Sequence, residues 1–128
     1  MKLLLDTCSF LWIGEGSSKL SETASRVFLD PENERYLSAA SVWEICIKYN
    51  NGKLSLPAHP QFYVAQLRER VGVDPLSIDE ESALQVAKLP NLHNDPFDRL
   101  LVAQSIVHGL TILTPDPLIT NYPARTLW

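Results

Sequence analysis

The chain has 128 residues, of which 45% are hydrophobic and 20% are charged, and its formal net charge at pH 7 is −4. This length and composition exclude a disordered chain and fit one domain with a substantial apolar core, so we expect residues 1–128 to form a single domain. The acidic balance argues against a protein that coats nucleic acid with a basic surface, but not against an enzyme whose metal ions hold phosphates.

The hydrophobic pattern predicts alternating strands and helices. Short apolar runs indicate strands, and longer segments that end at glycine or before proline indicate helices. The expected elements are a strand at 2–5, helices at 8–13 and 22–30, a strand at 35–39, helices at 41–52 and 60–72, a weak strand at 73–78, helices at 79–89 and 96–108, a strand at 110–114, a one-turn helix at 115–120 and an edge segment at 125–128. Strands separated by helices favour a three-layer α/β/α sandwich with a central parallel sheet.

The N-terminal run 1-MKLLLD-6 is too short for a signal peptide or a membrane span. We therefore expect a cytoplasmic protein with no membrane partner. Cys8 and Cys46 lack the CxxC spacing of redox or metal sites, and we expect them to be reduced, half-buried packing residues.

Four acidic residues stand where a parallel sheet would place a ligand site. Asp6 follows the first expected strand, and Asp116 follows the strand at 110–114, so both lie at the carboxyl edge of the sheet. Glu44 and Asp98 each fall in the first turn of an expected helix. If those helices begin at the same edge, all four carboxylates could converge there.

Each acid also has a local interpretation as a cap or a dipole partner, with a stabilising effect of roughly 0.3–1 kcal/mol. Lys48 could pair with Glu44 at i, i+4 spacing. The local alternatives are a Ser41-x-x-Glu44 capping box, an Asp95 cap with Asp98 in the first turn, turn formation at Asp116, and a cap by Asp6 on the 8–13 helix.

The surroundings of Asp98 and Glu44 weigh against a purely local role. Leu101 and Val102 follow Asp98 on its own helix face, and apolar residues surround Glu44 except toward Lys48. A carboxylate in such a setting is costly unless it is paired, protonated or bound to metal. Four converging acids would repel one another and raise several pKa values unless a cation were present. Oxygen ligands suit Mg²⁺ or Mn²⁺ better than zinc, and no histidine stands at ligand spacing from another.

The order and spacing of these residues resemble the PIN-domain nucleases, and in particular the bacterial toxins of VapC-type toxin–antitoxin pairs. The matching pieces are 6-DT-7, Glu44, 93-HNDPFDRLLVAQ-104 and 114-TPD-116, and they span essentially the whole chain.

The resemblance implies a PIN-like sandwich with the first and fourth strands adjacent, and a metal-dependent endoribonuclease that hydrolyses RNA phosphodiester bonds. It implies that Asp6, Glu44, Asp98 and Asp116 are the catalytic acids and hold one or two Mg²⁺ or Mn²⁺ ions. Asp6 and Asp98 would be the chief ligands, and the other two would bind directly or through water.

The resemblance also implies supporting residues and partners. Thr7 and Thr114 would orient carboxylates, and Asp95 would cap its helix or lie behind the metal ligands. Arg99 would contact phosphate or form a surface ion pair. Lys48, Lys53, Arg68 and Arg70 would guide RNA or lie on solvated faces. The expected partners are the RNA substrate, a small antitoxin protein and a second copy in a homodimer, with 8–13 and 62–67 as interface or core.

Other classes fit less well. A phosphate-transferring dehalogenase-type enzyme needs a second acid where Cys8 stands, and 6-DTCSF-10 has no glycine-rich phosphate loop. The remaining alternative is a PIN-like module that binds RNA or a protein without cutting RNA.

Overall fold

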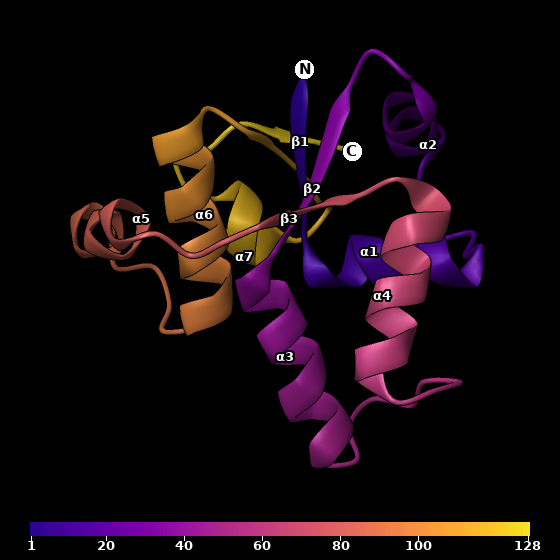
Figure 1. The fold of residues 1–128 in the computed structure, drawn as a ribbon. Helices are drawn as coiled ribbons and strands as arrows, with labels where there is room; N and C mark the ends of the chain where they lie inside the picture. Colours follow the sequence, from indigo (N-terminus) through magenta and orange to yellow (C-terminus); the bar gives the residue numbers. More distant parts are fainter.

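The computed structural model describes all of residues 1–128 and contains one five-stranded sheet in the order β3-β2-β1-β4-β5 (Figure 1). Every neighbouring pair of strands is parallel. The strands are β1 (Lys2–Leu5), β2 (Glu34–Ser38), β3 (Asp74–Leu76), β4 (Thr111–Leu113) and β5 (Thr126–Leu127). The predicted parallel sheet and the adjacency of the first and fourth strands are confirmed.

Helices cover both faces of this sheet. They are α1 (Thr7–Glu15), α2 (Glu22–Leu29), α3 (Ala39–Asn50), α4 (Pro60–Val71), α5 (Glu80–Gln85), α6 (Pro96–His108) and α7 (Pro117–Thr120), with a 3₁₀ turn, η1 (Val86–Lys88), after α5. No helix is both long and apolar enough to cross a membrane.

The alternation of β-strand side chains builds two apolar cores, one on each face of the sheet. Leu4 and Ile112 pack with buried residues of α6 and α7 on one face. Leu5 and Leu113 pack with buried residues of α1, α2 and α4 on the other face. The three layers are visible in Figure 1, where α6 and α7 lie on one side and α1, α2 and α4 on the other. The predicted α/β/α sandwich is confirmed.

The start of α3 differs from the prediction. Ser38, the last residue of β2, is the N-cap, and its hydroxyl accepts a hydrogen bond from the amide of Ala40 at 3.0 Å. The helix therefore begins at Ala39, and Glu44 lies in its second turn. The predicted Ser41–Glu44 capping box is wrong, because the chain turns into the helix directly at the strand end.

The first helix is also longer than predicted. It runs through Gly14 and ends at Gly16, which has a φ of +62°. Gly14 instead allows a close approach of α4, since a Cβ there would lie 2.6 Å from Leu67 and Tyr63 side-chain atoms. Further along, the helix predicted at 79–89 ends at Gln85 and continues only as the turn η1.

Candidate active site

The ends of β1 and β4 place Asp6 next to Thr114. Leu5 pairs with Leu113 in the sheet, so the residues that follow them are neighbours. Thr114 Oγ1 donates a hydrogen bond to Asp6 Oδ2 at 2.5 Å, and the amide of Ser9 donates to Asp6 Oδ1 at 2.8 Å. Asp6 therefore caps α1, as one local interpretation proposed, while its carboxylate is only 4% exposed at the sheet edge.

Thr7, the residue that follows Asp6, connects Glu44 to the same edge of the sheet. Thr7 Oγ1 donates to Glu44 Oε1 at 2.5 Å, and Lys48 Nζ lies 2.8 Å from Glu44 Oε2. The predicted i, i+4 ion pair is thus present, together with a hydrogen bond from a threonine 37 positions away. Because Glu44 is buried, both partners offset the cost of taking its charge out of water.

Asp98 enters the site from the first turn of α6. Asp95 is the N-cap of this helix, and its carboxylate accepts hydrogen bonds from the amides of Phe97 at 2.9 Å and Asp98 at 3.3 Å. The half-buried Asp98 carboxylate has no such partner of its own. Desolvation, followed by the negative charges of Asp95, Glu44 and Asp116, raises the pKa of Asp98 to about 7.

Asp116 completes the group from the start of α7. Its carboxylate accepts a hydrogen bond from the amide of Leu118 at 2.9 Å, and its own amide donates to Thr114 Oγ1 at 3.1 Å. The charge of Asp116 contributes to the raised pKa of both Asp6 and Asp98, although burial is the larger cause in each. The charges of Glu44 and Asp116 therefore act on Asp98, and the charge of Asp116 acts on Asp6.

Cys8 lies in the same neighbourhood. It is exposed and not half-buried as predicted, and it lies in the first turn of α1. Partial desolvation and then the charge of Asp6, with smaller contributions from Glu44 and Asp116, raise the pKa of its thiol to about 11. A thiol with so high a pKa stays protonated at neutral pH and is a poor nucleophile.

The donor set at this edge of the sheet fits a hard divalent cation. Its donors are carboxylate and hydroxyl oxygens, which suit Mg²⁺ and Mn²⁺, and Asp98 offers a half-buried carboxylate without a protein partner. No three acidic, histidine or cysteine side chains are arranged here so that they could hold an ion together. Asp6, Glu44 and Asp116 each accept hydrogen bonds from protein donors instead.

Comparison with known proteins matches the PIN domain family model to residues 3–124. The chain belongs to the PIN domain family. Over 82 residues it is 38% identical to Ribonuclease VapC16 of Mycobacterium tuberculosis, an alignment that spans 57% of each chain. The match thus spans little more than half the length of that curated relative.

Solved structures share the PIN fold along nearly the whole chain. VapBC2 from Rickettsia felis, bound to a promoter DNA fragment, superposes with a TM-score of 0.74 at 15% identity, covering 99% of this chain and 98% of that one. VapBC-1 from nontypeable Haemophilus influenzae gives a TM-score of 0.67 at 16% identity, covering 99% and 97%. At these identities the similarity establishes the fold.

His93, the first residue of the PIN-like 93-HNDPFD-98 motif, has a role that the sequence did not reveal. Its Nδ1 accepts a hydrogen bond from the amide of Asp95 at 3.0 Å. The proton is then on Nε2, which donates to the carbonyl oxygen of Leu118 at 2.8 Å. His93 therefore connects the start of α6, which carries Asp98, to α7, which begins beside Asp116. The H-x-D spacing was the signal for this contact.

Arg99 forms no surface ion pair, which was one of the two roles predicted for it, and the phosphate contact stays a prediction. Its guanidinium donates to the carbonyl oxygens of Pro90 at 3.0 Å and Val86 at 3.2 Å, and to the hydroxyl of Tyr122 at 2.9 Å. Arginine has five N–H donors in a fixed fork, and here they satisfy the backbone of the turn before α6. Arg99 thus holds that loop and forms no surface ion pair.

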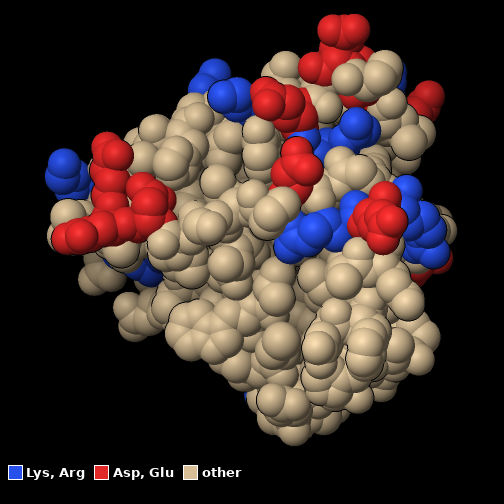
Figure 2. Space-filling view, in the orientation of Figure 1, with Lys and Arg blue, Asp and Glu red and all other residues tan.

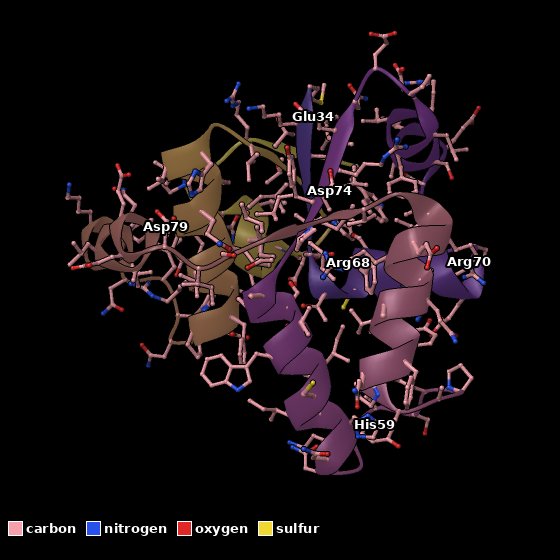
Figure 3. The ribbon with its side chains drawn as sticks, viewed as in Figure 1. Glu34, His59, Arg68, Arg70, Asp74 and Asp79 are labelled. Carbon is pink, nitrogen blue, oxygen red and sulfur yellow. The ribbon has the colours of Figure 1, made fainter.

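The basic residues of α4 differ in their surroundings. Arg68 is half-buried on the side of α4 toward the sheet, and desolvation lowers the pKa of its guanidinium (Figure 3). It lines a cavity of about 700 Å³ with His59 and Asp74. Arg70 is exposed and donates to the carbonyl oxygen of Gly14 at 3.2 Å. Arg68 therefore does not lie on a fully solvated face, which was one of the two settings expected for it.

The two stretches expected to be interface or core, 8–13 and 62–67, contain both buried and exposed residues. Phe10 is completely buried, whereas Phe62 is 57% exposed. Trp43 of α3 is 57% exposed as well. The lower part of the molecule in Figure 2, where α3 and the start of α4 lie in Figure 1, shows almost no charge.

Proposed function

We propose that residues 1–128 are one PIN nuclease domain that hydrolyses RNA phosphodiester bonds with the help of Mg²⁺ or Mn²⁺. The observation that carries this proposal is the Asp98 carboxylate, which lies half-buried and without a partner in the field of Asp95, Glu44 and Asp116. Such a group is stabilised by a divalent cation. The 38% identity to a protein named a ribonuclease supports RNA as the substrate.

In this proposal Asp6 and Asp98 are the chief metal ligands, and Glu44 and Asp116 bind directly or through water. The cation would activate a water molecule and neutralise charge on the phosphate. Thr7 and Thr114 keep the carboxylates of Glu44 and Asp6 oriented. Lys48 pairs with Glu44 and is partly exposed, so it places a positive charge beside the acids, where the RNA backbone would bind.

The proposed biological role is that of the toxin in a toxin–antitoxin pair in the cytoplasm. The proposed partners are a small antitoxin and a second copy of the chain. The identity to VapC16 and the fold shared with VapBC complexes support this role. Exposed aromatic residues, here Trp43 and Phe62, are typical of protein interfaces.

The alternative is a PIN domain that binds RNA or protein without cutting. The absence of a ready three-ligand group in the structure favours this alternative.

Cleavage of a labelled RNA by the purified chain separates the two. With Mg²⁺ or Mn²⁺ the wild type should cleave, and a chelator should abolish cleavage. Asp98→Asn and Asp6→Asn should each lower kcat by about 100-fold or more. Glu22→Gln is a matched control, because Glu22 is an exposed acid in the first turn of α2. No cleavage by the wild type with either metal would favour the alternative, and undiminished cleavage by Asp98→Asn would show that this carboxylate does not hold a catalytic cation.

A further inference from the structure

Gln104, on α6, is the largest polar side chain that is completely excluded from solvent. Its amide oxygen accepts a hydrogen bond from Ser38 Oγ at 2.6 Å, and its amide nitrogen donates to the carbonyl oxygen of Ser77 at 3.1 Å. The orientation of the amide is fixed, because only the NH₂ group can bond to a carbonyl oxygen. Gln104 thus ties α6 to the ends of β2 and β3.

The same contact fixes the start of α3. Ser38 Oγ accepts from the amide of Ala40 and gives its own proton to Gln104, so both sides of this hydroxyl are used. A buried amide is costly unless bonded, and its net gain in stability is small even when it is bonded. A leucine would fill the space but leave the buried Ser38 hydroxyl without this acceptor and the Ser77 carbonyl oxygen without this donor. What the amide adds is a defined position for the first turn of α3 relative to α6.

Two of the site acids stand the same number of residues away from this joint. Glu44 stands six residues after Ser38 on α3, and Asp98 stands six residues before Gln104 on α6. Six residues of helix correspond to about 9 Å. The helices pack against each other, with the N-terminal end of α6 beside α3 (Figure 1). Trp43 and Phe97, which precede these acids, touch with ring centroids 5.1 Å apart.

We propose that Gln104 is a positioning residue that sets the separation of Glu44 and Asp98 through the start of α3. A rotation of about 10° about the joint would move either acid by about 1.5 Å at that distance. Mg²⁺ requires ligands at nearly fixed distances and so does not tolerate such a shift. This inference rests on the proposed function, because it assumes that both acids serve one cation.

The test is Mn²⁺ affinity measured by calorimetry in Gln104→Met, which keeps the length of the side chain and removes both hydrogen bonds. The Kd should weaken about fivefold or more, and kcat on RNA should fall while KM stays within about twofold. Ser82→Ala is the matched control. Ser82 is also completely buried, and its hydroxyl donates to Asp79 at 2.6 Å on α5. This control should lose stability and keep its Mn²⁺ affinity.

The outcomes separate this inference from the proposed function. If Gln104→Met does not fold, Ser38→Ala is measured in the same way, since it removes the hydroxyl and leaves the bond from Gln104 to Ser77. A wild-type Kd in either folded variant overturns the positioning role and leaves the nuclease proposal standing. A wild-type chain that binds no Mn²⁺ overturns both. Weakened affinity in the variants, with the control unchanged, supports the inference.

Discussion

Thr114 donates a hydrogen bond to the carboxylate of Asp6 at 2.5 Å, across the ends of two neighbouring parallel strands. The same hydroxyl accepts from the amide of Asp116 at 3.1 Å, so one threonine connects two of the four acids. Thr7 Oγ1 likewise donates a hydrogen bond to the carboxylate of Glu44. The carboxylates of Asp6 and Glu44 in this PIN domain therefore each accept a hydrogen bond from a neutral threonine hydroxyl, and of the two only Glu44 also has a cationic partner, Lys48.

Replacing Thr114 with valine tests this arrangement. The variant keeps the shape of a buried side chain and leaves Asp6 without its hydroxyl donor, so the free energy of unfolding should fall by about 1–2 kcal/mol. RNA cleavage should slow by about tenfold because Asp6 is no longer held in place. Thr111→Val, at the half-buried start of β4, is the control for the substitution itself. An unchanged cleavage rate in Thr114→Val would show that the hydroxyl does not orient Asp6.

Lys48 and a metal ion would compete for Glu44. In Lys48→Met the ion pair is lost, and stability should fall by only about 0.5–1 kcal/mol because the lysine side chain is 46% exposed. The Kd for Mn²⁺ should tighten by about two- to fivefold, since the site becomes more negative. Lys53→Met removes a nearby exposed lysine with no ion pair and serves as control. Weaker Mn²⁺ binding in Lys48→Met would contradict the competition.

The raised pKa of Asp98 predicts a pH-dependent stability in metal-free protein. Its pKa rises from 3.8 to about 7, so the folded state holds this proton more tightly than the unfolded state. The resulting contribution to stability is complete below about pH 4 and is lost as the pH rises to about 7. In a chelator, Asp98→Asn should therefore melt above wild type near pH 8 and equal to it near pH 4. Equal melting temperatures at both values would contradict the raised pKa.

Asp79 predicts the opposite pH dependence, away from the site. Hydrogen bonds from Ser82 and His108 lower the pKa of Asp79 to about 2 (labelled in Figure 3). The stability that this group contributes is present above about pH 4 and is lost as the pH falls through about 2. Asp79→Asn should lower the melting temperature near neutral pH and leave Mn²⁺ affinity unchanged. A change in Mn²⁺ affinity would mean that α5 is coupled to the site.

The sheet and the long helices could be predicted because their signals are local. Asp6 and Asp116 follow apolar strands, and parallel strands end at one edge whatever their order. The helix that carries Asp98 has an aspartate cap, a proline in the first turn and a glycine just past its end, and all three features are present in the structure. These predictions needed no knowledge of distant contacts.

The features that the sequence did not predict depend on contacts between distant residues. Ser38 and Ser41 can both cap a helix, and the choice depends on where β2 ends and on Gln104, 66 positions away. The donors of Arg99 are satisfied by carbonyl oxygens of a turn whose shape no local pattern shows. The roles of Asp6, Glu44, Asp98 and Asp116 as metal ligands stay a prediction.

The most direct test of the central claim is a calorimetric titration of the metal-free chain with Mn²⁺, alongside Asp98→Asn. We predict saturable binding to the wild type and an affinity weakened by about 100-fold or more in the variant, with both proteins folded. If the wild type binds no Mn²⁺, or if Asp98→Asn binds it as well as the wild type does, the four carboxylates do not form a cation site.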